Sequence, residues 1–182
     1  NGVLYFYLLT SMDITGNESE PTNQSSIFTS SSRYSILFSS ASQDYQYGTI
    51  NIGNNVLIDS MGIEFWVNTD SQADPILYRK DGSTDTHPFW SLEIEDGLLS
   101  FVGLTAMGNS FSIKSETNVT GEWVHCGLFV QSDSIRMFIN GIKESSIIKP
   151  NGDFAEKQKI WMGTKGSNIS PDFNNQLDGY IY

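Results

Sequence analysis

The chain is poor in cysteine and has no long apolar run. Cys126 is the one cysteine among 182 residues, so no internal disulfide can form. It lies within the apolar stretch VHCGLFV, where we expect a small buried hydrophobe rather than a catalytic thiol. No stretch approaches the roughly 18 apolar residues of a membrane helix. The apolar opening GVLYFYLL is too short and aromatic for a signal peptide, and it lacks a small-residue cleavage site.

Basic residues are also scarce. Lys and Arg number 10 against 21 Asp and Glu, which gives a net charge of −11. A surface this acidic argues against nucleic-acid binding, which requires basic groups opposite the phosphates, and against adsorption on anionic lipid. Two interpretations of the acidity stay open. The charge either keeps the protein soluble, or some of the carboxylates hold a divalent cation.

Helical periodicity is missing as well. No window of about a dozen residues keeps apolar residues at the i, i+3, i+4 and i+7 positions of an amphipathic helix. Short apolar or alternating runs instead follow one another from end to end, separated by Gly, Asn, Asp and Pro. This pattern predicts an all-β sandwich or barrel. The polar, Ser-rich segment of residues 15–33 is expected to form a long surface loop.

Several strands and turns can be located from local patterns. The run SLEIE alternates, which places Leu92 and Ile94 on a core-facing side. Residues 121–146 predict three antiparallel strands, because a QSDS turn and the pair Asn140-Gly141 separate three largely apolar runs. The pair Asp96-Gly97 predicts another tight hairpin.

Four parts of the chain, taken in order, resemble a known family. They are YFYLLTSMDITGN, GIEFWVNTDSQADPILYRKDG, TGEWVHCGLFVQSDSIRMFINGIKE, and the pair KIWMGT and LDGYIY. Together they resemble the laminin G-like branch of the concanavalin A-like lectin/glucanase superfamily, which also includes pentraxins. The resemblance implies a jelly-roll β-sandwich of two curved antiparallel sheets, formed by a single domain over residues 1–182. It also implies that Trp123 plugs the core. The family usually continues past the position of Tyr182, which leaves open a last strand cut short at the C-terminus.

Calcium is the metal that the sequence supports best. The MDITGN turn supplies Asp13 and the carbonyl of Gly16, and the LDG turn supplies Asp178. If the first and last strands of the sandwich pair, these two segments meet and provide the oxygen ligands that calcium prefers. The resemblance implies a structural ion at such a place. The alternative is that Asp13 only caps its own turn.

A second acidic region is a candidate ligand site. Residues 68–75 and 79–90 predict loops on which acidic, histidine and aromatic side chains gather. Loops on a rigid sandwich often carry recognition, an aromatic ring can stack on a sugar, and carboxylates can bind hydroxyl groups. The alternative is a set of ordinary solvated hairpin tips. The candidate ligand-binding residues are Asp70, Asp74, Asp85, His87 and Trp90.

The sequence gives little support for catalysis. Glu93 and Glu95 share a strand face, as the carboxylates of a glucanase would, but Leu98 occupies the position of the third carboxylate. No Gly-x-Ser-x-Gly elbow is present, and the two histidines are not spaced for zinc. His125 is expected to be a hydrogen-bonded core residue. We therefore expect no enzymatic activity.

The remaining signals concern location and role. Sequons at Asn17, Asn23, Asn118 and Asn168 are candidate glycosylation sites of an extracellular protein. The chain starts with Asn, so we expect one module of a larger secreted or surface-anchored protein. The sequence predicts a non-catalytic recognition (adhesion) module, a lectin-like domain that binds glycan or protein through loops at one rim. Two alternatives stay open, a glycoside hydrolase-type relative acting on polysaccharide and a purely structural spacer.

Overall fold

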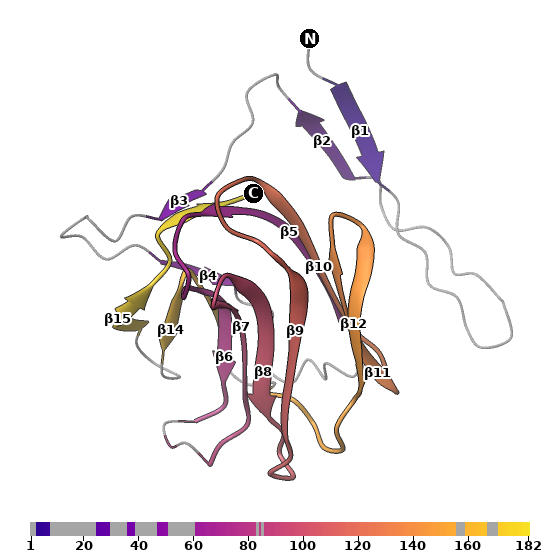
Figure 1. Ribbon diagram of the computed structural model, residues 1–182, viewed down its shortest axis with the longest axis vertical. Coiled ribbons are helices and arrows are strands. Elements are labelled where there is room, and N and C mark those ends of the chain that lie inside the picture. The colour runs from indigo at the N-terminus through magenta and orange to yellow at the C-terminus, as the bar shows by residue number, and fades with distance from the viewer. Residues whose placement is uncertain are drawn as a thin grey trace, which may run out of the picture. The chain divides into compact units, whose positions relative to one another are not determined.

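The computed structural model describes residues 3–7, 25–29, 36–38, 47–50, 61–82, 84, 86–155, 159–166 and 171–182 (Figure 1). The chain divides into two compact units, residues 1–35 and 36–182. In the first unit, β1 (Val3–Tyr7) pairs antiparallel with β2 (Ser25–Thr29). The expected loop over residues 15–33 is wrong at residues 25–29, because the Ile-Phe-Thr sequence there favours a strand; the rest of that segment lies outside the described residues. The single domain over residues 1–182 stays a prediction.

Two six-stranded antiparallel sheets make up the second unit (Figure 1). In the β5 sheet the strand order is β12-β11-β10-β5-β16-β3, and in the β7 sheet it is β4-β13-β6-β7-β8-β9. The β5 sheet consists of β3 (Ile36–Phe38), β5 (Met61–Thr69), β10 (Val124–Val130), β11 (Ser134–Ile139), β12 (Ile142–Ile148) and β16 (Gly179–Ile181). The β7 sheet consists of β4 (Gly48–Ile50), β6 (Pro75–Lys80), β7 (Phe89–Glu95), β8 (Leu98–Leu104), β9 (Ser110–Asn118) and β13 (Ile160–Met162). A further hairpin pairs β14 (Thr164–Gly166) with β15 (Pro171–Gln176).

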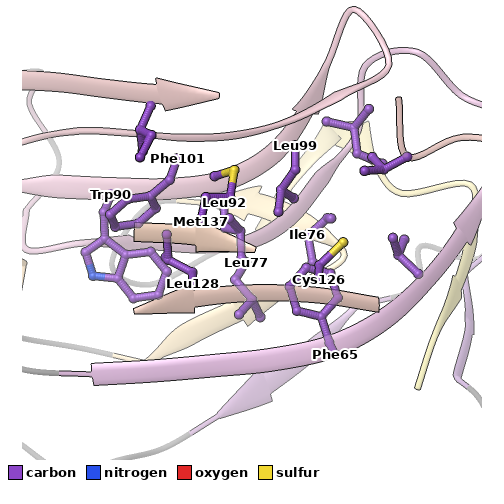
Figure 2. Close-up of a cluster of buried hydrophobic side chains, with 14 of the residues drawn as sticks. Phe65, Ile76, Leu77, Trp90, Leu92, Leu99, Phe101, Cys126, Leu128 and Met137 are labelled. Atoms are coloured by element: carbon purple, nitrogen blue, oxygen red, sulfur yellow. The ribbon is translucent and has the colours of Figure 1, made fainter. Parts of the chain in front are cut away.

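The inner faces of the two sheets form one hydrophobic core (Figure 2). Phe65, Leu128 and Met137 come from the β5 sheet, and Leu92 and Phe101 come from the β7 sheet. Alternate residues of a strand point to opposite faces, so strands such as β11 contribute every second side chain to this core. No helix occurs among the described residues, and the strands of both sheets curve (Figure 1). The predicted jelly-roll β-sandwich is therefore confirmed.

The two predicted tight hairpins are also confirmed. Asp96 and Gly97, between β7 and β8, have φ values of 55° and 75°. Asn140 and Gly141, between β11 and β12, have φ values of 51° and 80°. Two consecutive positive φ angles match the right-handed twist of a two-residue hairpin, and they are tolerated best by Asn, Asp and Gly. The three strands β10, β11 and β12 pair antiparallel in sequence, as expected.

Trp123 does not plug the core, so this implication of the resemblance is wrong. Its side chain is 43% exposed, and the centre of its ring lies 6.0 Å from the centre of the Tyr180 ring. The adjacent Val124 is buried, so the pleat directs Trp123 outward. Trp90, by contrast, is fully buried in the core, with its ring centre 6.0 Å from that of Phe101.

His125 and Cys126 occupy opposite faces of β10. Cys126 is fully buried, as predicted. His125 is partly exposed and its ring lies 5.1 Å from that of Trp66, so the expectation of a core histidine is wrong. Among the residues described, no helix has the length and apolar character needed to cross a membrane.

Candidate functional site

The loop between β5 and β6 is anchored at both ends. Thr69 ends β5, and its buried hydroxyl accepts a hydrogen bond from the Ser71 amide at 3.0 Å. Asp74 exchanges two backbone hydrogen bonds, of 2.7 and 3.1 Å, with Ile94 of β7. The loop backbone is therefore fixed by both sheets, while the Asp70 side chain remains exposed.

Asp74 ties a second loop, between β15 and β16, to the first. Its Oδ2 accepts a hydrogen bond from the Asp178 amide at 3.0 Å, and the Thr69 hydroxyl donates to the Asp178 carbonyl oxygen. At Gly179 a Cβ would lie 2.4 Å from the Asn68 carbonyl oxygen, so only glycine permits this close approach of β16 to β5. Residues 104 positions apart in sequence are thereby held together.

These two loops line an open pocket of about 450 Å³, which we call the rim pocket. Asn68, Asp70, Asp178 and Gln176 are among its polar lining residues, and Tyr180 contributes an aromatic ring. Within the described part of the chain, the buried Nε2 of Gln176 has no hydrogen-bond partner, which is unusual for a buried donor. Such a lining can bind hydroxyl groups and pack against a ring.

The electrostatics of the rim pocket disfavour added negative charge. Burial raises the pKa of the Asp74 carboxyl above its ordinary value, although hydrogen bonds from Asp178, Ser71 and Thr69 oppose the shift. The neighbouring charge of Asp178 raises this pKa further. A neutral or cationic partner is therefore electrostatically preferred over an anionic one.

The structure brings together only some of the predicted ligand-binding residues. Asp70 and Asp74 both line the rim pocket. His87 is not among the lining residues and lies between β6 and β7, where its Nδ1 is 2.6 Å from the Thr84 hydroxyl. Asp85 lies outside the described residues.

Trp90 cannot offer a face to a sugar in this structure. Its side chain has no exposed surface, because it shares the inward face of β7 with Leu92. The prediction of Trp90 as a ligand-binding residue beside the loops therefore has to be corrected. Tyr180, which is 39% exposed, provides the aromatic ring at the rim pocket instead.

The predicted calcium ligands are placed only in part. Asp178 lines the rim pocket, but Asp13 and Gly16 lie outside the described residues. Among the described strands, β16 pairs with β3 and β5 while β1 pairs with β2, so the expected pairing of first and last strands is not found there. In the same part of the chain, no group of three or more His, Cys, Asp or Glu side chains is arranged to hold a metal ion. The oxygen-rich lining suits calcium chemically, but its described carboxylates alone do not form a site.

The sequence matches a laminin G profile of the concanavalin A-like lectin/glucanases superfamily over residues 42–181. The chain belongs to this laminin G-like family. A search of curated protein sequences found no match. The family membership accounts for the two curved antiparallel sheets, and the resemblance read from the sequence is confirmed.

Several solved structures share this laminin G-like fold. Domains LG4–5 of the mouse laminin α1 chain superpose with a TM-score of 0.64 at 13% identity, covering 79% of this chain and 39% of that one. The LG1–3 region of the laminin α2 chain gives 0.63 at 18% identity, covering 91% and 35%. The CBM40 of Ruminococcus gnavus IT-sialidase bound to α2,3-sialyllactose gives 0.57 at 13% identity, covering 69% and 73%. The chain thus spans little more than a third of the two laminin structures, and the likeness establishes the fold alone.

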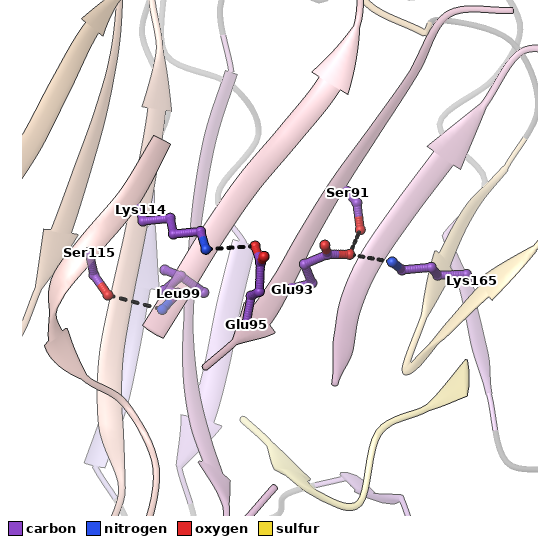
Figure 3. Close-up of polar contacts among 7 residues, drawn as sticks. All are labelled: Ser91, Glu93, Glu95, Leu99, Lys114, Ser115 and Lys165. Carbon is purple, nitrogen blue, oxygen red and sulfur yellow. Dashed lines mark hydrogen bonds and ion pairs between the residues drawn. The ribbon is translucent and has the colours of Figure 1, made fainter. Parts of the chain in front are cut away.

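The two carboxylates weighed as a glucanase pair, Glu93 and Glu95, each lie beside a lysine (Figure 3). Glu93 accepts a hydrogen bond from the Ser91 hydroxyl and pairs with Lys165, both at 2.6 Å. Glu95 pairs with Lys114 at 2.9 Å, and this hydrogen bond lowers the pKa of its carboxyl. A general acid requires a raised pKa, which the Glu95 carboxyl does not have.

Of the four sequons, one is described. Asn118 is exposed, and its Oδ1 accepts hydrogen bonds from the Thr120 amide and hydroxyl at 2.8 and 2.7 Å. Asn17, Asn23 and Asn168 lie outside the described residues. Glycosylation stays a prediction.

Asn68 and Gln176 are among the polar residues of the rim pocket that the sequence reasoning missed. Asn68 could have been found, because it continues the outward face that carries Trp66. Gln176 could not, because its position depends on how β16 pairs with β5, a long-range contact without a local signal.

Proposed function

We propose that this laminin G-like domain is a recognition module that binds a glycan in the rim pocket. The proposal is carried by two features of one pocket: the buried Nε2 of Gln176, which has no hydrogen-bond partner within the described part of the chain, and the exposed ring of Tyr180. A sugar hydroxyl would satisfy the amide donor, and the apolar face of a pyranose would pack against the ring. Asp70 would accept hydrogen bonds from further hydroxyl groups.

The charge of the pocket selects among glycans. Asp70, Asp74 and Asp178 make the lining acidic. The R. gnavus CBM40 was solved with sialyllactose, whose sialic acid carries a carboxylate. At this rim pocket that carboxylate would meet like charges, so we expect neutral sugars to bind and sialylated ones not to bind.

Binding assays on point variants test the proposal. A glycan array should identify neutral sugars, and Asp70→Ala, Gln176→Ala and Tyr180→Ala should each weaken binding by about tenfold or more, as central contact residues do. Exposed residues of the same type elsewhere serve as matched controls: Asp153→Ala and Tyr47→Ala should bind normally. Unchanged affinity in all three rim variants would remove the rim pocket as the site. A protein ligand that competes at these residues would replace the glycan in the proposal.

Calcium is part of the proposal as a structural ion. The acidic lining would be stabilised by a divalent cation, with Asp178 as one ligand, whereas the other predicted ligands, Asp13 and Gly16, lie outside the described residues. Scanning calorimetry in calcium and in chelator should show a higher melting temperature with calcium, and Asp178→Asn should abolish the difference. A transition that is the same in calcium and chelator would contradict this assignment.

We further propose that the domain is non-catalytic, extracellular and part of a larger chain. The lysine pairing of Glu93 and Glu95 supports the first point. Incubation with neutral polysaccharides should release no reducing ends. Release that is lost in Glu93→Gln would favour the glycoside hydrolase alternative.

A further inference from the structure

A second hollow lies on the outer face of the β5 sheet. Its volume is about 380 Å³, and its lining includes Glu64, His125, Gly127, Phe129, Arg136 and Phe138. We call it the face pocket. Strands β5, β10 and β11 supply these residues, which alternate with the buried residues of the core. Ligand sites of this size typically combine aromatic walls with a few polar groups, as this one does.

The strand register sets the layout of the face pocket. Gly127 lies between Glu64 on β5 and Phe138 on β11, and the next outward row of β10 and β11 pairs Phe129 with Arg136. The rings of Phe129 and Phe138 stand at 85° with centres 5.4 Å apart. The pocket therefore has a glycine floor, two phenyl walls at right angles, and one carboxylate and one guanidinium at its margins.

The fold does not require glycine at position 127. Gly127 is not among the described residues with positive φ, and a Cβ there would lie 3.4 Å from Phe129 and 3.5 Å from Phe138, which are ordinary contacts. Glycine in the middle of a strand weakens that strand, because it adds entropy to the unfolded chain and packs no side chain. Because Gly127 has no side chain, it leaves the space of the face pocket open.

Strand β5 connects the face pocket to the rim pocket. Glu64, Trp66 and Asn68 point outward in succession, with Glu64 lining the face pocket and Asn68 the rim pocket. Trp66 lies between them, 40% exposed, with its ring 5.1 Å from that of His125. Four residues of extended strand span about 13 Å, which is longer than one sugar ring.

We propose that the two pockets are subsites of one track that binds a linear, uncharged oligosaccharide along β5. This inference rests on the proposed glycan binding at the rim pocket and extends it to a chain-type ligand. Glu64 and Arg136 cancel in charge, and the acidic rim disfavours anionic sugars, so a neutral chain fits both ends of the track. Exposed aromatic rings in a row suit the apolar faces of successive sugars.

Calorimetric titration with neutral oligosaccharides of two lengths tests the track. Cellohexaose, laminarihexaose, maltohexaose and chitohexaose would be compared with their disaccharides. At least one hexasaccharide should bind about tenfold or more tightly than its disaccharide, because it reaches both pockets.

Gly127→Val fills the hollow with a strand-favouring side chain, so it should remove this length advantage while the melting temperature stays the same or rises. Trp66→Ala should act in the same direction, and Tyr47→Ala, an exposed aromatic beside β4 of the other sheet, should not.

The outcomes separate this inference from the proposed function. If Gln176→Ala weakens binding, but disaccharide and hexasaccharide bind equally and Gly127→Val has no effect, the track is overturned and the rim site stands. If Gly127→Val weakens binding and Gln176→Ala does not, the rim site fails and the track fails with it. If none of the eight probes binds, the track is also overturned.

Discussion

Asp74 is the residue whose replacement tests most directly how the rim pocket is held together. Its buried carboxylate accepts a hydrogen bond from the Asp178 amide at 3.0 Å. In Asp74→Ala this amide loses its acceptor, and the side-chain link between the two loops is lost. A buried group left unpaired costs about 1–3 kcal/mol of unfolding free energy, which lowers the melting temperature of a chain this size by about 2–12 °C.

The isosteric variant Asp74→Asn separates the charge of this residue from its shape. Burial raises the pKa of the Asp74 carboxyl in the folded state, so the fold tolerates the protonated form best. The contribution of the protonated Asp74 carboxyl to the free energy of unfolding is complete below the unfolded-state pKa of about 3.9. This contribution is lost as the pH rises through the raised folded-state pKa. Urea unfolding at about pH 3, 5 and 7 should therefore show the wild type losing stability relative to Asp74→Asn as the pH increases.

The matched control is Asp153→Asn, which changes an exposed aspartate on another loop and should show no such trend. Two results would refute the reasoning: an Asp74→Ala variant as stable as the wild type, or a difference from Asp74→Asn that is constant with pH. Calcium bound beside the carboxylate would stabilise its charged form, so added calcium should flatten the pH dependence.

Three further predictions concern the core and the sheet edges. Trp90→Ala should lose about 3–5 kcal/mol of unfolding free energy, whereas Trp123→Ala should lose about 1 kcal/mol or less, as measured by urea unfolding. Burial raises the pKa of Cys126 to about 12, so the thiol should react with a disulfide reagent only after denaturant is added; rapid labelling of the native protein would contradict this. Burial alone would raise the pKa of the Glu144 carboxyl. Hydrogen bonds from the Thr117 side chain and from the Thr117 and Glu116 amides instead hold this pKa below its usual value. Glu144→Gln should therefore cost about 1 kcal/mol at neutral pH, and that difference should vanish in urea titrations as the pH falls through the lowered pKa.

The sequence predicted features that depend on neighbouring residues. The pairs Asp96-Gly97 and Asn140-Gly141 identified their hairpins, because positive φ is a local property of these residue types. Alternation identified the buried Leu92 and Ile94 for the same reason, since the pleat is fixed by the strand itself.

The two tryptophans were assigned the wrong way round for a reason that the pleat explains. Trp90 lies two residues before Leu92, so strict alternation already places it inward, whereas the prediction made it a ligand-binding residue beside the loops. Trp123 was placed in the core by resemblance, although it immediately precedes the inward Val124. In both cases the period-2 pattern of the strand was the better guide than loop assignment or family analogy.

The rim pocket could not be assembled from the sequence, because its parts meet through long-range pairing. Asp70 and Asp178 were assigned to separate sites, one for a ligand and one for a metal, yet they line the same pocket. Their proximity follows from the pairing of β16 with β5 and from the hydrogen bond between Asp74 and the Asp178 amide. Nothing in a local pattern specifies which of the strands the last one will join.

The two outer faces of the sandwich differ in a way that bears on where a ligand would bind. On the β7 sheet the two outward carboxylates of β7 itself, Glu93 and Glu95, each pair with a lysine. On the β5 sheet, Glu64 makes no ion pair within the described part of the chain, and the exposed ring of Trp66 lies next to it in the outward series. Covering exposed aromatic surface is favourable, while separating a partly exposed ion pair to reach a carboxylate adds a small cost. A ligand therefore gains more free energy on the β5 face, and if binding were instead lost in Lys114→Ala or Lys165→Ala, this assignment of the faces would have to be reversed.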